Sequence, residues 1–468
     1  MVIFILQVME KSKIAIAVAL LFLTFFKGFS QGIIIRDINI EGSYFVENFD
    51  RNNFRVAYKI FSKDERLSDF NIVTFDSLLI VTDTSKISMF GNYHILGVAS
   101  TKENSAYLLG SASNSSLVLH IIDNKTGIGI DHRIKSQFKW TDGTPCYLET
   151  LENNFYLLID GKISELIAIA PSGNAIWQRS FTGAGSTLEI NFMKAVDSLL
   201  FLSFTYNPRT NKTKNELRVI DPITGNESFS LPMIYGTKKL TIDNIIPYSD
   251  KEVVLTGRSF KNLKRNESSS GIPYFALVNH ATGSFNFSEI KTKEGNIYWM
   301  SLLKSPSNQS EYLIGETFTS DPPVYIPLGG FAGVIANSIA TSAYTCTLRF
   351  NKIVFVKLNK IIDHEFQSYS VAARAFSVNK YLHPYRFARY AYSRGKAHYF
   401  GSNGNGEIYN ISSGDIKKYN PTDKTEQTIG TIPNLNAPSI IFLSKGYALY
   451  AEQNPSSKEL VFNYIKLP

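Results

Sequence analysis

Cysteine and tryptophan are scarce in this 468-residue chain, which has two cysteines and three tryptophans. Two cysteines, Cys146 and Cys346, cannot build a disulfide scaffold. Neither belongs to a CxxC or another metal-ligand spacing. Two alternatives stay open for them: one bridge in an oxidising compartment, or two buried thiols.

The usual short catalytic signatures are also missing. The chain contains no HExxH, no GxSxG, no Walker loop and no S-x-D-x-G-x-T-W box. Its seven histidines are scattered, and none pairs with another at metal-ligand spacing. We therefore predict no metal site and no cofactor. An enzyme remains an alternative, because an active site can be assembled from residues far apart in the sequence.

Long apolar runs are absent after residue 30, so no transmembrane segment is predicted in the mature chain. The N-terminus differs: Lys11 and Lys13 precede an apolar run over residues 14–26, and Gly28 and Ser30 suit a cut before Gln31. This layout is typical of a signal peptide over residues 1–30, with Met9 as the true start. An uncleaved anchor is the alternative. We expect an exported protein in the periplasm, at the cell surface or outside the cell.

The charge balance is mildly basic, with a formal net charge of +8. A mild positive charge favours binding to acidic polymers or envelope surfaces, but it is not diagnostic of nucleic-acid binding. An exported chain has little contact with nucleic acid, so no nucleic-acid partner is expected.

What the chain has in abundance is a repeated pattern. Four similar segments join an apolar run to a second extended run through a polar turn with Gly, and they start at Ile121, Ile169, Val219 and Leu277. A second pattern, a short turn before an apolar-aromatic run, occurs seven times at intervals of about 45–60 residues, with one gap of about 85. Each repeat therefore reads as four strands joined by turns.

Four antiparallel strands at this period resemble the blade of a β-propeller. Residues 398–430 look kelch-like, and "IAPSGNAIWQRSF" is similar to a docking turn of quinoprotein-type propellers, with Trp177 in the docking position. The resemblance implies an all-β fold with seven blades, or eight if the N-terminal strands form part of one. The last repeat stops after three strands, so N-terminal strands are expected to close the ring. The expected divisions are a signal peptide (1–30), closing strands (31–90) and the propeller (91–468), with the last two forming one domain.

The repeated turn itself could be a ligand loop or a hairpin turn. Asp221, Thr224 and Gly225 could grip a metal or phosphate, but Asp and Thr also bond local backbone and Gly accepts a positive φ. Four copies at blade spacing favour a structural turn.

Loop lengths point to one face. In a propeller the connections between strands B and C, and between D and the next A, share a face, and three consecutive B–C connections are long: 205–216, 258–273 and 317–346. A long D–A connection around Ser377 to Phe387 joins them. The stretch from His383 to His398 is the densest in aromatic and basic residues and is expected to form an inner strand. Basic and aromatic residues of this stretch and of the long connections are the candidate ligand contacts: Arg209, Lys212, Arg258, Lys261, Arg265, Tyr325, Tyr385, Arg386, Tyr390 and Arg394. Solvated loop charge and packing between blades are the alternative roles for them.

These observations favour a non-catalytic binding or scaffolding propeller whose partner is a protein or glycan of the cell envelope. The alternative is a propeller enzyme acting on a polysaccharide or glycoside. A quinone-cofactor enzyme is a weaker third, because repeated Trp turns and adjacent cysteines are missing.

Overall fold

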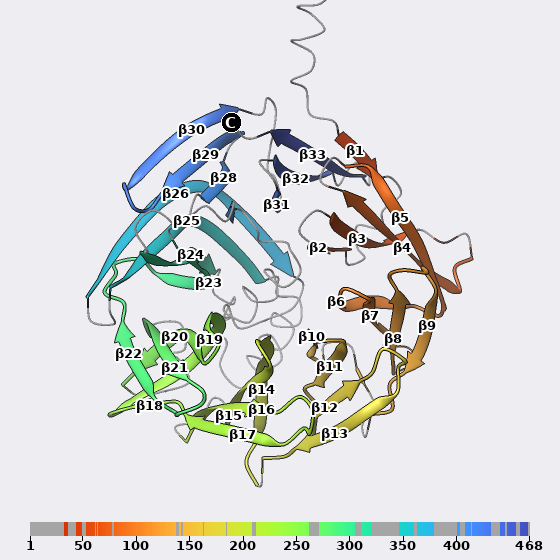
Figure 1. Ribbon diagram of the computed structural model, residues 1–468, viewed down its shortest axis with the longest axis horizontal. Helices are drawn as coiled ribbons and strands as arrows, with labels where there is room; N and C mark the ends of the chain where they lie inside the picture. Colours follow the sequence, from red (N-terminus) through yellow and green to blue (C-terminus); the bar gives the residue numbers. More distant parts are fainter. Residues whose placement is uncertain are drawn as a thin grey trace, which may run out of the picture.

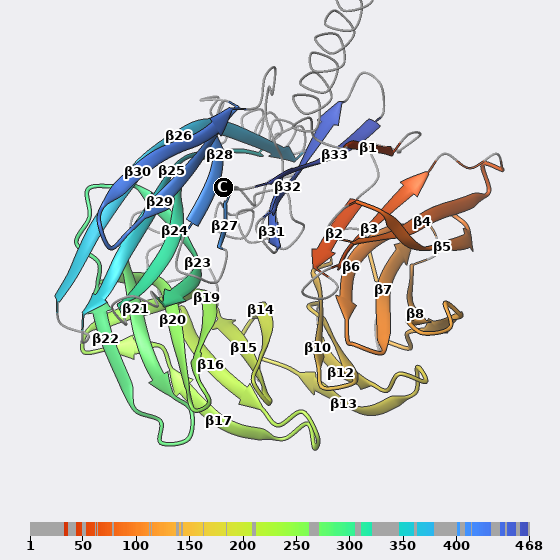
Figure 2. The same cartoon turned by 45° about the horizontal axis from the view of Figure 1, so that its top comes forward.

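The computed structural model describes residues 32–35, 44–48, 53–60, 62, 64–76, 79–111, 113, 115–136, 140–141, 144–161, 163–183, 185–207, 212–261, 271–304, 310–320, 346–359, 363–378, 400–402, 408–412, 414–431, 440–444, 447–454 and 459–466. These residues form 33 β-strands in eight antiparallel sheets. The sheets follow one another around a ring in chain order (Figures 1 and 2). The fold is therefore a β-propeller, with the larger of the two expected blade numbers.

The first four blades take their strands in sequence order. Blade I contains β2 (Tyr44–Asn48), β3 (Asn53–Ile60), β4 (Leu67–Asp76) and β5 (Val81–Phe90). Blade II contains β6 (His94–Ser100), β7 (Asn104–Ser111), β8 (Ser116–Asp123) and β9 (Gly129–Arg133). Blade III contains β10 (Cys146–Leu151), β11 (Asn154–Ile159), β12 (Ser164–Ile169) and β13 (Ala175–Phe181). Blade IV contains β14 (Leu188–Val196), β15 (Leu199–Tyr206), β16 (Lys214–Ile220) and β17 (Glu227–Pro232).

The other four blades include one with a fifth strand. Blade V contains β18 (Ile234–Tyr235), β19 (Lys238–Ser249), β20 (Glu252–Phe260), β21 (Ile272–Asn279) and β22 (Phe285–Glu289). Blade VI contains β23 (Asn296–Lys304), β24 (Glu311–Ser320), β25 (Cys346–Asn359) and β26 (Asp363–Val378). Blade VII contains β27 (Phe400–Ser402), β28 (Ile408–Ser412), β29 (Asp415–Asn420) and β30 (Thr425–Thr431). Blade VIII contains β31 (Ile440–Ser444), β32 (Tyr447–Asn454), β33 (Glu459–Lys466) and β1 (Gly32–Ile35).

An N-terminal strand closes the ring, as expected. Strand β1 pairs antiparallel with β33, from Gly32 opposite Asn463 to Ile35 opposite Leu460. The rest of the N-terminal region forms blade I, a complete sheet of its own. Pairing β1 with β33 leaves no open edge on the last C-terminal strand, which is the physical reason for this closure.

Apolar side chains between neighbouring blades make the core. Between blades IV and V, for example, Phe192, Leu217, Leu255 and Tyr274 are all buried in one cluster. A four-stranded sheet cannot bury both of its faces by itself, so each blade depends on the next. No helix of the described residues is both long and apolar enough to cross a membrane.

Strands β6, β14, β19 and β23, each in a different blade, carry a β-bulge. The register shifts around Leu96 in β6, Asn191 in β14, Asp243 in β19 and Met300 in β23. A bulge leaves one backbone residue outside the ladder. In two of these bulges, at Asn191 and at Met300, a side chain of the preceding blade bonds to the irregular segment.

Each of these bonds joins a side chain of one blade to a backbone carbonyl of the next blade. The Tyr147 hydroxyl of blade III donates to the Asn191 carbonyl of blade IV at 2.6 Å. The Asn244 amide of blade V donates to the Trp299 carbonyl of blade VI at 3.0 Å. A buried carbonyl without a donor costs free energy, so these contacts stabilise the bulges.

The repeated turn segments are hairpin turns between strands C and D. In blade IV the Asp221 carboxylate accepts hydrogen bonds from the backbone N–H groups of Ile223 (2.8 Å) and Thr224 (2.9 Å), and Gly225 has a φ of +71°. Asp123 accepts the same pair of bonds in blade II. The carboxylates are thus used by their own backbone, which favours the structural interpretation.

Candidate functional site

The three long B–C connections are shorter than the sequence suggested. They run over 207–213, 261–271 and 321–345, because the flanking strands continue to pair beyond the first polar residues. Tyr206 pairs with Lys214, and Ser259 pairs with Ile272. We call the side of the ring that carries the B–C and D–A connections the loop face.

Three of the ten predicted ligand residues lie in the described part of the chain. Lys212 and Lys261 are exposed at the ends of their loops. Arg258 is only 4% exposed and belongs to β20 rather than to a loop. The other seven residues lie outside the described residues: Arg209, Arg265, Tyr325, Tyr385, Arg386, Tyr390 and Arg394.

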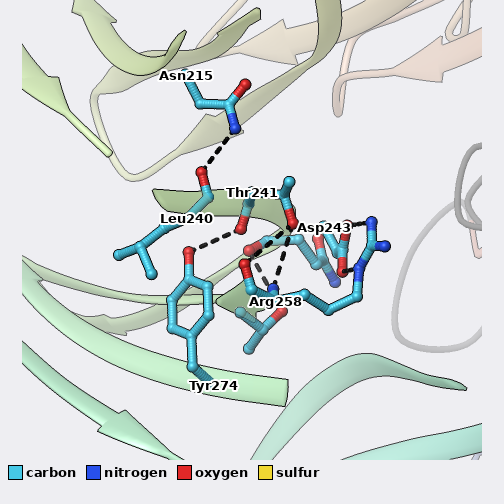
Figure 3. A network of polar contacts seen from close by, with 8 residues as sticks. Asn215, Leu240, Thr241, Asp243, Arg258 and Tyr274 are labelled. Atoms are coloured by element: carbon cyan, nitrogen blue, oxygen red, sulfur yellow. Dashed lines mark hydrogen bonds and ion pairs between the residues drawn. The ribbon is translucent and has the colours of Figure 1, made fainter. Parts of the chain in front are cut away.

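Arg258 forms a buried ion pair with the bulge residue Asp243. Its Nε lies 3.1 Å from Oδ2 and its Nη2 lies 3.2 Å from Oδ1, and both side chains are about 5% exposed (Figure 3). The bulge turns the carboxylate of β19 toward the neighbouring strand. Two charges removed from water require this bidentate geometry.

The ion pair belongs to a network that links blades IV and V. The Asn191 amide donates to Thr205 Oγ1 (2.7 Å), which donates to Asn215 Oδ1 (2.8 Å). The Asn215 amide donates in turn to the Leu240 carbonyl of blade V at 2.8 Å (Figure 3). The next residue, Thr241, lies beside Arg258. The network therefore fixes the loop-face ends of two adjacent blades relative to each other.

Tyr274 extends this network toward an aromatic stack. Its hydroxyl donates to the Thr241 carbonyl at 2.8 Å, and its ring is fully buried (Figure 3). Phe287 of β22 lies over Tyr274 with 5.1 Å between ring centroids. Tyr235 of β18 lies over Phe287 with 4.5 Å between centroids and an interplanar angle of 26°. Three rings thus run from the core to the surface.

Charged side chains surround the outer end of the stack. Lys238 Nζ lies 2.7 Å from Glu289 Oε1, and the Ser259 hydroxyl also donates to Glu289. Burial raises the pKa of Glu289, but the bonds from Lys238 and Ser259 outweigh it, so the pKa is lowered and the carboxylate stays ionised. Lys239 Nζ donates to the Thr213 carbonyl at 3.2 Å, which joins this surface to the 207–213 loop.

The structure brings together residues that the sequence did not indicate. Asp243, Tyr235 and Phe287 are part of this arrangement, whereas the sequence singled out loop residues. Two signals were present: a lone acid in the apolar run "LTIDNII", and the short hairpin pattern "IYGTKK" just before it.

No metal centre is formed by the described residues, since they contain no group of three or more His, Cys, Asp and Glu side chains placed to hold an ion. Cys146 carries a free thiol, whose pKa burial raises to about 12. In the described residues Cys146 is therefore not part of a disulfide.

Comparison with known proteins finds similarity to solved structures only. No family model and no curated protein sequence matches the chain. Among solved structures, the chain is similar to the β-propeller domain of the Trilobed protease from Pyrococcus furiosus, with 8% identity and a TM-score of 0.40, over 90% of this chain and 95% of that one. It is also similar to the WD40 domain of coronin from Toxoplasma gondii, with 8% identity and a TM-score of 0.38 over 91% and 89%. A europium-containing methanol dehydrogenase shares 9% identity, with a TM-score of 0.42 over 90% and 91%.

Proposed function

We propose that this protein is an exported, non-catalytic binding or scaffolding propeller of the periplasm or cell surface. Its partner is a protein or glycan of the cell envelope that meets the loop face of blades IV to VI. The observation that carries the proposal is the aromatic stack that runs from buried Tyr274 through Phe287 to exposed Tyr235. The Tyr274 hydroxyl is bonded to the Thr241 carbonyl, and Lys239 is bonded to the Thr213 carbonyl at the end of the 207–213 loop. Rigid surfaces of this kind bind with little loss of conformational entropy.

The charges near this surface support binding over hydrolysis. Asp243, Glu289 and Glu294 each bind a cation, namely Arg258, Lys238 and Lys352. Glycoside hydrolysis needs two carboxyl groups that are free to exchange protons or attack the sugar. Carboxylates held in ion pairs suit a positioning role instead.

The proposal is tested by affinity capture from an envelope extract. Residues 31–468 are compared with a variant in which residues 321–345 are replaced by an Asn-Gly turn, at low and high salt. A control variant, Lys125→Glu, changes an exposed charge on a C–D turn of the opposite face. We expect the replacement to remove a captured component that the control retains, and high salt to weaken its capture. Equal recovery with and without the 321–345 loop would refute the assignment of the loop face.

A further inference from the structure

Blade V has a hairpin that gives it a fifth strand. Strand β18 pairs with the start of β19, with Ile234 opposite Lys239 and Tyr235 opposite Lys238, and Gly236 in the turn has a φ of +59°. It is the one five-stranded sheet among the eight that the described residues form. The hairpin lies in a D–A connection and therefore on the loop face.

The hairpin presents an aromatic ring that is supported from one side. Tyr235 is 47% exposed although it stacks on Phe287, which itself packs on the buried ring of Tyr274. The Tyr274 hydroxyl is bonded to the backbone of β19, so the bottom of the stack cannot shift freely. A ring held in this way needs no ordering when a ligand covers its free side. Flat apolar faces with polar edges, such as those of pyranose rings, fit such a platform.

The charges around the platform are mostly positive. Lys238 and Lys239 follow the hairpin turn, Lys261 acts on Glu289 through its charge, and Lys212 precedes the Thr213 carbonyl that binds Lys239. Glu289 is bonded to Lys238 and is also acted on by the charge of Lys261. Lysines next to the exposed ring attract anionic ligands and disfavour basic ones.

We infer that the Tyr235 platform is a subsite for an acidic polysaccharide, with a sugar ring stacked on Tyr235 and its carboxylate or sulfate facing the lysines. This inference rests on the proposed binding function and names its ligand class. An acidic protein would satisfy the lysines but would present no pyranose face to the aromatic ring.

The inference is tested by titration calorimetry on residues 31–468 with three probes: oligogalacturonate, neutral dextran and polyglutamate. We expect oligogalacturonate to bind more tightly than either of the others. Tyr235→Ala should weaken that binding about two- to twelvefold, since an aromatic stacking contact is worth roughly 0.5–1.5 kcal/mol. Tyr235→Phe keeps the ring and should change it by less than about twofold. Lys261→Glu should weaken binding at low salt and have less effect at high salt.

Two substitutions elsewhere serve as matched controls. Phe90→Ala removes another exposed ring (71% exposed, in β5), and Lys125→Glu reverses a charge in a distant turn. Both should leave oligogalacturonate binding unchanged. If wild-type protein binds none of the probes, binds polyglutamate as well as oligogalacturonate, or binds equally with Tyr235→Ala, the inference is overturned.

The same variants separate this inference from the proposed function. If capture from the envelope extract depends on residues 321–345 but not on Tyr235, the loop face still binds a partner and the platform is not its sugar subsite. If capture depends on neither, both assignments fail.

Discussion

The indole of Trp177, in the outer strand of blade III, packs over Gly225 in the C–D turn of blade IV. Its Nε1–H donates to the Pro222 carbonyl at 2.8 Å, and a Cβ added to Gly225 would come within 2.8 Å of the ring. His132 covers Gly173 and Phe229 covers Gly283 in the same way, one blade before and one blade after. The repeated glycine therefore serves both the left-handed turn and the docking of a neighbouring side chain.

Gly225→Ala should destabilise the fold more than Gly127→Ala. Both glycines have a φ of +71°, so both substitutions incur the backbone strain of about 1 kcal/mol. A Cβ at Gly127 meets nothing within 4 Å, whereas one at Gly225 collides with Trp177. We expect a further loss of about 1–3 kcal/mol at Gly225 from overpacking, measured by urea denaturation. Equal losses for the two variants would argue against the docking contact.

Breaking the Asp243–Arg258 pair from one side should be costly. Asp243→Asn removes the carboxylate that is bonded to the buried guanidinium and should lower the free energy of unfolding by about 3–5 kcal/mol. Replacing both residues, as in Asp243→Leu with Arg258→Met, should recover most of this loss. The exposed pair Asp64–Arg66 is the control, and Asp64→Asn should produce no measurable shift in the urea midpoint. A double variant no more stable than Asp243→Asn would contradict this account.

The Cys146 thiol should resist alkylation while the protein is folded. Burial raises its pKa to about 12, so at pH 8 the thiolate fraction is about one in ten thousand. The measurement is the rate of iodoacetamide modification in a Cys346→Ser background, with and without urea. We expect iodoacetamide to modify Cys146 only when urea has unfolded the protein. Rapid modification of the native protein would show that the thiol is accessible and ionised.

Glu149→Gln should remove a pH dependence of stability. Glu149 of β10 has its pKa raised above the usual 4.5 by burial, although Lys194 of the neighbouring blade opposes the shift. Between 4.5 and the raised value the folded state binds more protons than the unfolded state, so stability falls as pH rises through this window. The glutamine variant should lack this fall and be at least as stable as wild type at pH 7. Thermal melts from pH 4 to pH 8 would detect it, and an unchanged profile would disprove the role of Glu149.

Much of the fold could be predicted from the sequence. Apolar runs bounded by Gly, Asn and Asp gave strands such as β6 and β20, and the missing fourth strand after β33 indicated closure by the N-terminus. The sequence does not decide between seven and eight blades, because residues 44–90 lack the Gly-containing turn that marks blades II to V. Strand patterns there are clear, but the period that identifies a blade is not.

The site was less predictable, for a physical reason. Arg258 looks like a loop residue because charge is usually placed in water, yet the bulge at Asp243 provides a partner inside the sheet. Bulges depend on pairing between strands and leave no clear mark in one sequence. The stack of Tyr235 on Phe287 joins residues from opposite edges of blade V, which local periodicity does not reveal.

The docking of Trp177, His132 and Phe229 gives the ring a direction. In these three contacts an outer strand leans on the turn of the blade that follows it in the chain. A pull on the outer strand of blade III is thus resisted by blade IV, and that of blade IV by blade V. Under mechanical load, unfolding of blades II to V should therefore depend on direction. Pulling from blade V removes the turn that supports blade IV, whereas pulling from blade II leaves the supports of the later blades in place.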